Sequence, residues 1–231
     1  MVCNLYILHG AGESPLLSVA VDIYLAICYN LLMEYEFMGG TEMYYHASPV
    51  EGITELEPRV SNHKTPFIYF SKKRENVLVY LSNAIEKYCK ETNFPHDGIW
   101  QKWAAYGFDK DGIQRIEEYY PNALEKTYQG VSGYIYTVEH INEADFELQI
   151  PDAAASATPV RVLEVEYVPD AYLAILEAER NGLVRILRYE NMTEKHHAWL
   201  KETIKREYET SVDHPEYMHF LRGNFPDLVG E

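Results

Sequence analysis

Cysteine is scarce in this chain of 231 residues. The three cysteines, Cys3, Cys28 and Cys89, are widely spaced and form no C-x-x-C pair. A disulfide scaffold needs more cysteines, and a structural zinc site needs them at closer spacing. We therefore expect a protein of the reducing cytoplasm that holds no metal ion.

Basic residues are also few. The chain has 20 Lys and Arg against 36 Asp and Glu, which gives a formal net charge of −16 at pH 7. Binding to nucleic acid phosphates requires clustered cations, so a basic surface spread over the whole protein is excluded. We expect no nucleic acid partner, although a local basic pocket stays open.

Several motifs of common enzymes are missing. The sequence has no P-loop, no internal repeat and no G-x-S-x-G elbow to accompany the His-Gly-Ala-Gly turn at residues 9–12. Its late histidines lack the H-E-x-x-H spacing of a zinc site, and we interpret them as packing or surface residues. They are His196, His197, His214 and His219.

The longest apolar run, residues 16–33, contains Asp22 and Asn30. No Lys or Arg precedes it, and Asp22 near its middle argues against a membrane span. We expect no membrane partner and interpret the run as an amphipathic or buried helix. An alternative is that translation begins at Met38 or Met43, which would make this stretch an upstream extension.

Four short segments favour β-strands. They are residues 44–48, which end at Pro49, residues 67–70 and 133–138, and residues 159–168. The last alternates with period two, so Glu164 and Glu166 share one face. Residues 51–66 and 139–158 are polar or small and indicate loops.

Helical spacing predicts a helix over residues 71–91 with Ser71 as its N-cap. Further helices are expected over residues 169–180, 193–211 and 214–223, with a strand at 184–189 between them. This order predicts an α+β domain with a mixed, mostly antiparallel sheet and flanking helices. We divide the chain into an N-terminal extension (1–42), a main domain (43–190) and C-terminal helices packed on it (191–231).

The densest basic run is Lys72-Lys73-Arg74, at the predicted start of the first helix. Cations are disfavoured at the positive end of a helix dipole. The run is therefore either a solvated turn or an anion site, because cations and free helix N–H groups together suit a phosphate.

The order of four motifs resembles the ADP-ribosyltransferase superfamily, and more narrowly small bacterial enzymes of the rifampicin ADP-ribosyltransferase type and related uncharacterised bacterial proteins. The motifs are Tyr45-His46-Ala47-Ser48, Ile68-Tyr69-Phe70-Ser71, Gly133-Tyr134-Ile135-Tyr136 and Thr158-Pro159-Val160-Arg161-Val162. They cover roughly residues 43–168. The resemblance implies a split sheet with flanking helices and NAD as co-substrate.

The resemblance also implies a role for each residue of the site. His46, within the strand Tyr45 to Ser48, would hydrogen-bond the nicotinamide ribose, and the backbone of Ala47 would hold the carboxamide. Tyr69 would stack on the nicotinamide ring, and Ser71 would support it. From its charge, we expect the run from Lys72 to Arg74 to lie near the pyrophosphate.

Cleavage of the bond between nicotinamide and ribose builds positive charge on the sugar, which a nearby carboxylate stabilises. The family places a Glu at or just before the late strand, but here Ala157-Thr158-Pro159 occupies that turn. The candidates are Glu164 and Glu166, which lie further along the strand, and Asp152. The sequence also has Ala47 where the family usually has Gly.

We therefore expect an NAD-binding protein that transfers ADP-ribose to an unknown small-molecule or protein acceptor, a glycosyltransferase reaction. One alternative is a catalytically inactive module on the same fold that binds a nucleotide or a protein. Another is a structural interaction protein with no ligand. A carboxylate within reach of the ribose would separate the first two.

Overall fold

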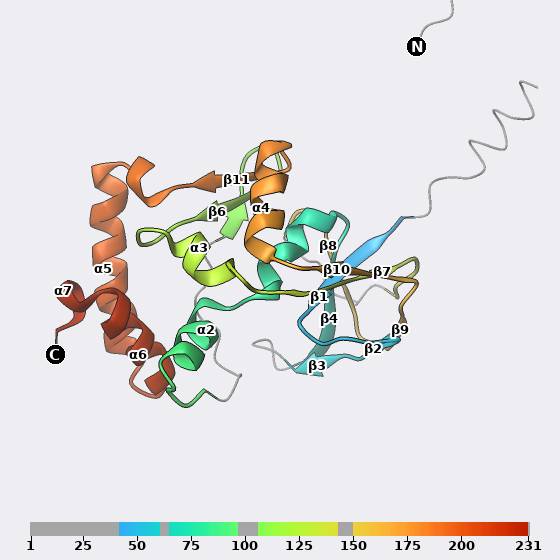
Figure 1. Cartoon of the computed structure of the whole chain (residues 1–231), viewed down its shortest axis with the longest axis horizontal. Helices are drawn as coiled ribbons and strands as arrows, with labels where there is room; N and C mark the ends of the chain where they lie inside the picture. The colour runs from blue at the N-terminus through green and yellow to red at the C-terminus, as the bar shows by residue number, and fades with distance from the viewer. Residues whose placement is uncertain (1–41, 61–64, 97–105, 143–149, 231) are drawn as a thin grey trace, which may run out of the picture. The chain divides into compact units, whose positions relative to one another are not determined.

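The computed structural model of the chain (Figure 1) describes residues 42–60, 65–96, 106–142 and 150–230. By its internal contacts the chain forms two units, residues 1–41 and residues 42–231. The C-terminal helices belong to the second unit. The helix expected at 16–33 lies outside the described residues.

The largest sheet has six strands in the order β10-β7-β1-β4-β3, with β8 also paired to β4. All its pairings are antiparallel. Its strands are β1 (Tyr44–Ser48), β3 (Arg59–Val60), β4 (Pro66–Ser71), β7 (Gly133–Val138), β8 (Ala153–Ser156) and β10 (Glu164–Val168). The expected strands at 44–48, 67–70 and 133–138 are therefore confirmed.

Two smaller sheets complete the strands. β2 (Glu55–Leu56) pairs with β9 (Val160–Arg161), and β6 (Gln114–Glu117) lies between β5 (Tyr106–Phe108) and β11 (Val184–Leu187). The β11–β6 pairing is parallel, whereas the other pairings are antiparallel. With helices flanking these sheets, the predicted α+β class is confirmed.

The two faces of β1 pack into different hydrophobic clusters. Tyr44 packs with Phe70 and Val138, among others. Ala47 instead packs with Leu78 of the 3₁₀ helix η1 (Arg74–Leu81) and Ile175 of α4 (Ala171–Arg180). Successive strand residues point to opposite faces, so η1 and α4 cover one face of the sheet at β1.

The single strand expected at 159–168 is instead two strands, β9 and β10. The chain changes its pairing partner between them. The Val162 N–H donates to the Thr54 carbonyl (3.0 Å), and the Leu163 N–H donates to the Thr137 carbonyl (2.9 Å). The expected loops were also wrong in part, since residues 51–66 contain β2 and β3 and residues 139–158 contain β8.

The single helix expected at 71–91 is likewise two, η1 and α2 (Ala84–Glu91). Ser71 does not cap a helix, because it lies in β4 opposite Ala153 of β8. The cap of α2 is Asn83, whose Oδ1 accepts from the N–H groups of Ile85 (3.0 Å) and Glu86 (3.1 Å). The chain is extended at Ser82 and Asn83, which separates η1 from α2.

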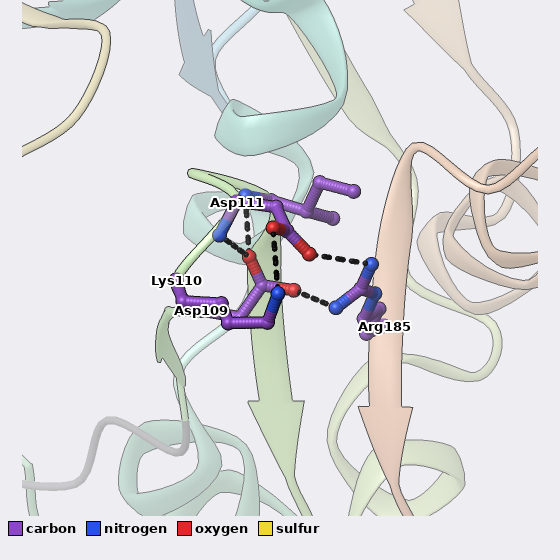
Figure 2. A network of polar contacts seen from close by, with 5 residues as sticks. Asp109, Lys110, Asp111 and Arg185 are labelled. Carbon is purple, nitrogen blue, oxygen red and sulfur yellow. Dashed lines mark hydrogen bonds and ion pairs between the residues drawn. The ribbon is translucent and has the colours of Figure 1, made fainter.

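The turn between β5 and β6 is tied to β11 by charged side chains (Figure 2). The Asp109 carboxylate accepts from the N–H groups of Asp111 (2.8 Å) and Ile113 (3.0 Å). Arg185 of β11 forms ion pairs with both Asp109 and Asp111, the latter at 3.2 Å. Burial acts to raise the pKa of Asp109, but these N–H donors and Arg185 bring it below its ordinary value.

The later helices follow the prediction closely. Asp170 caps α4, and Thr193 caps α5 (Glu194–Thr210), whose buried face includes Leu200 and Ile204. The remaining helices are α3 (Ala123–Tyr128), η2 (Tyr189–Asn191), α6 (Pro215–Asn224) and α7 (Pro226–Val229). Among the described residues, no helix has both the length and the apolar character to cross a membrane.

Candidate functional site

His46 lies where the ladder between β1 and β4 opens. The two strands share one register pair, Tyr45 with Ser71, whereas β1 pairs with β7 along its whole length. Beyond that pair, His46 Nδ1 lies 2.9 Å from the carbonyl oxygen of Tyr69. The histidine side chain therefore bridges the two strands where backbone pairing between them has ended.

Burial lowers the pKa of His46 below its ordinary value, and the charge of Arg59 lowers it further, against the opposing effect of the Tyr69 carbonyl. The imidazole is therefore neutral near pH 7. Because Nδ1 faces a carbonyl, which only accepts, we assign the proton to Nδ1. Nε2 is then a hydrogen-bond acceptor that suits a hydroxyl donor.

The side chain of Tyr69 points to the other face of the sheet from that of His46. Tyr45 and Ser71 are paired and share one face, and Tyr69, two residues before Ser71, lies on that face too. His46 lies on the opposite face, with its ring 6.0 Å from that of Phe70. The structure thus joins His46 to the backbone of Tyr69 rather than to its ring.

Ser71 holds the turn that leads from β4 into η1. Its Oγ accepts from the Lys73 N–H (3.1 Å) and from Asn76 Nδ2 (3.3 Å). Ser48, at the end of β1, acts similarly, since its Oγ accepts from the Val50 N–H at 3.2 Å. Both hydroxyls thus stabilise turns beside the expected site.

Each cation of the basic run is paired with a carboxylate. Lys72 Nζ lies 2.6 Å from Glu42, and Lys73 Nζ lies 2.6 Å from Asp152. Arg74 holds Glu166 through two nitrogens, with Nε at 2.7 Å. The hydrogen bond from Lys72 lowers the pKa of Glu42, and the hydrogen bond from Arg74 to Glu166 raises the pKa of Arg74. The run therefore forms three ion pairs, and an anion would have to compete with these carboxylates.

The strand register separates Glu164 and Glu166 from His46. Along β7, His46 is level with Tyr136, which is level with Val165. Paired residues share a face, so His46 and Val165 point one way while both glutamates point to the opposite face. The structure therefore does not bring these two expected catalytic residues to the side chain of His46.

Asp152, the third candidate acid, directly precedes Ala153, which pairs with Ser71. Its carbonyl accepts from the Lys72 N–H at 2.7 Å, so its backbone is fixed beside the end of β4. Asp152 is thus the candidate acid held beside Ser71, where it pairs with Lys73. Glu166 pairs with Arg74 but lies on β10, which β7 and β1 separate from β4.

Ala47 has a buried side chain in the cluster beneath η1 and lies opposite Ile135 of β7. Tyr45 packs partly buried against the same cluster. An alanine fits here because the core accepts its methyl group, so Ala47 does not disrupt β1.

Two hollows were not anticipated from the sequence. A cavity of about 340 Å³ lies among residues of η1, α2, α3 and β6, and a wider groove of about 650 Å³ lies between β10 and α4. Neither is lined by His46 or Tyr69. The cavity is lined by segments far apart in sequence, whereas the groove, apart from Arg74, is lined by residues 166–180.

No protein family model, no curated protein and no solved structure matches this chain. Within the described part of the chain, no group of three or more His, Cys, Asp or Glu residues is placed to hold a metal ion.

Proposed function

We propose that this chain is an ADP-ribosyltransferase-like protein that binds NAD where β1 and β4 separate and transfers ADP-ribose to a small-molecule or protein acceptor. The observation that carries the proposal is the contact of His46 with the Tyr69 carbonyl at the end of the shared ladder. It joins the two strands that the family resemblance assigns to NAD.

The neutral imidazole supports this assignment. With its proton on Nδ1, His46 can accept a hydrogen bond from a ribose hydroxyl at Nε2. The described part of β4 pairs with β1 at Tyr45 and Ser71 and forms no further backbone pairing with it. The edge of β1 around Ala47 can therefore offer backbone groups to a carboxamide.

Transfer also requires a carboxylate that stabilises the positive charge developing on the ribose. Asp152, beside the end of β4, is the acid that we assign first, and Glu166, which faces away from His46, is the second candidate; each would act as a carboxylate partly neutralised by its cation. The acceptor's nucleophilic atom takes the ribose carbon, nicotinamide leaves with the bonding electrons, and the acceptor loses a proton.

A second candidate is a catalytically inactive module that binds a nucleotide or a protein. The register of β10 favours it, because Glu164 and Glu166 face away from the side of the sheet that carries His46. Such a module would bind NAD without releasing nicotinamide.

The test measures nicotinamide release from NAD and NAD binding by calorimetry on the same full-length protein. We expect both to be lost in His46→Ala and retained in His140→Ala, a change at an exposed histidine. Among the acids, Asp152→Asn and Glu166→Gln should identify the one whose loss stops release but not binding. Binding without release would select the inactive module, and absence of both would refute the NAD proposal.

A further inference from the structure

β10 is exposed on both of its faces. Its residues Glu164 to Tyr167 are all exposed, and only Val168 is buried. The face toward His46 carries Val165 and Tyr167, which are 46% and 56% exposed, and Leu163 just before the strand is 57% exposed. The other face carries the two glutamates. A strand that is left this exposed is a ready docking surface.

The outer edge of β10 also has no hydrogen-bonded partner strand among the described residues. The strand pairs with β7 on one side, and no other described strand pairs with it. Its free edge presents backbone N–H and C=O groups that can bind an extended chain. At its C-terminal end β10 borders the groove of about 650 Å³ lined by Tyr167, Leu173 and Glu177, among others. The groove provides room for side chains of an added strand.

We propose that β10 binds an extended segment of a partner protein in which apolar side chains alternate with Lys or Arg. The apolar side chains would pack on Val165 and Tyr167, and the basic ones would pair on the other face with Glu164, since Arg74 already holds Glu166. This inference does not depend on NAD binding.

Charge favours such a partner over a second copy of this chain. If two copies of β10 paired antiparallel with their apolar faces together, Glu164 would face Glu166 of the other copy, or Glu166 would face itself. Like charges directly opposite one another destabilise a strand pair. Shifting the pairing by one residue would instead place Val165 on the same face as a glutamate. A basic segment avoids both conflicts and is attracted by a chain of net charge −16.

The probe is a labelled eight-residue peptide that alternates Val and Lys, with blocked ends, and its binding to the full chain is measured by fluorescence anisotropy. We expect Val165→Lys to weaken binding about tenfold or more, since it places a charge in the apolar contact. The matched control is Leu183→Lys, at a side chain that is also 46% exposed and lies beside β11, and it should leave the affinity unchanged. Glu164→Lys should weaken binding at low ionic strength, with a smaller effect at high salt.

Three further peptides test whether the partner adds to β10 as a paired strand. A version with Glu in place of Lys should not bind, and one methylated at alternate backbone nitrogens should lose binding because it cannot donate to the strand edge. A peptide of the same composition with Val and Lys in separate blocks should bind more weakly. Equal binding by the methylated or block peptide would show simple charge attraction and overturn the proposal. So would a dimer, detected by sedimentation, that Val165→Lys dissociates, since a second copy would then be the occupant.

Discussion

Replacing Gly133 by Ala tests how closely the start of β7 packs. A Cβ at this glycine would lie 2.6 Å from Leu81 Cδ2 and 3.2 Å from the Ser48 carbonyl oxygen. The leucine must therefore shift. Overpacking of a core costs about 1–3 kcal/mol, and we take about 2 kcal/mol because Leu81 also lines the cavity of about 340 Å³ and has room to move.

Against this cost, removing a strand glycine recovers about 0.5–1 kcal/mol of chain entropy. The net loss in the free energy of unfolding should be about 1–1.5 kcal/mol. In a Leu81→Ala background the main clash is gone, so Gly133→Ala should stabilise by about 0.5–1 kcal/mol. The two changes would then be coupled by about 2 kcal/mol, a value typical of residues in contact.

Urea denaturation of the four proteins measures this coupling, with stability taken by linear extrapolation at constant slope. The matched control is Gly107→Ala in β5, where an added Cβ meets no atom within 4 Å. It should be neutral or slightly stabilising. If Gly133→Ala changed stability by the same amount in both backgrounds, the contact with Leu81 would not be the reason for the glycine, and the reasoning would fail.

Two further predictions concern single side chains. Burial lowers the pKa of His46. As the pH falls below about 6.5, the unfolded chain therefore binds the proton first, and the free energy of unfolding should fall between that pH and the folded-state pKa. Urea denaturation across this range should show a smaller fall in the free energy of unfolding for His46→Gln, and an identical pH slope in both proteins would contradict the buried neutral imidazole. Asn83→Ala should cost about 1 kcal/mol through loss of the α2 cap, while Asn83→Asp, which keeps the accepting oxygen, should cost much less by the same measurement.

Short-range sequence signals predicted much of the fold. β-Rich residues bounded by turn residues located β1, β4 and β7, and the capping residues Asp170 and Thr193 located the starts of α4 and α5. These signals act over a few residues, so they can be read without knowing what the element packs against. The α+β class followed from their order.

Tertiary packing decided what local patterns could not. Residues 74–91 form two helices because the chain is extended at Ser82 and Asn83, and Asn83 caps the second helix. Residues 159–168 break because their two halves pair with strands from different parts of the chain. A period of two cannot reveal such a change of partner.

The same distinction applies to the candidate site. The sequence by itself determined which residue types occur in the candidate motifs: a histidine, a tyrosine, a basic run and three acids. Only the tertiary structure decided which of these residues meet. His46 contacts the Tyr69 carbonyl, and Glu42, Asp152 and Glu166 pair with the cations of the basic run. The glutamates of β10 lie on the face of the sheet opposite to His46. The physical reason is that strand register and ion pairing join residues tens of positions apart, and a shift of one residue in register would reverse the face of every side chain on the strand.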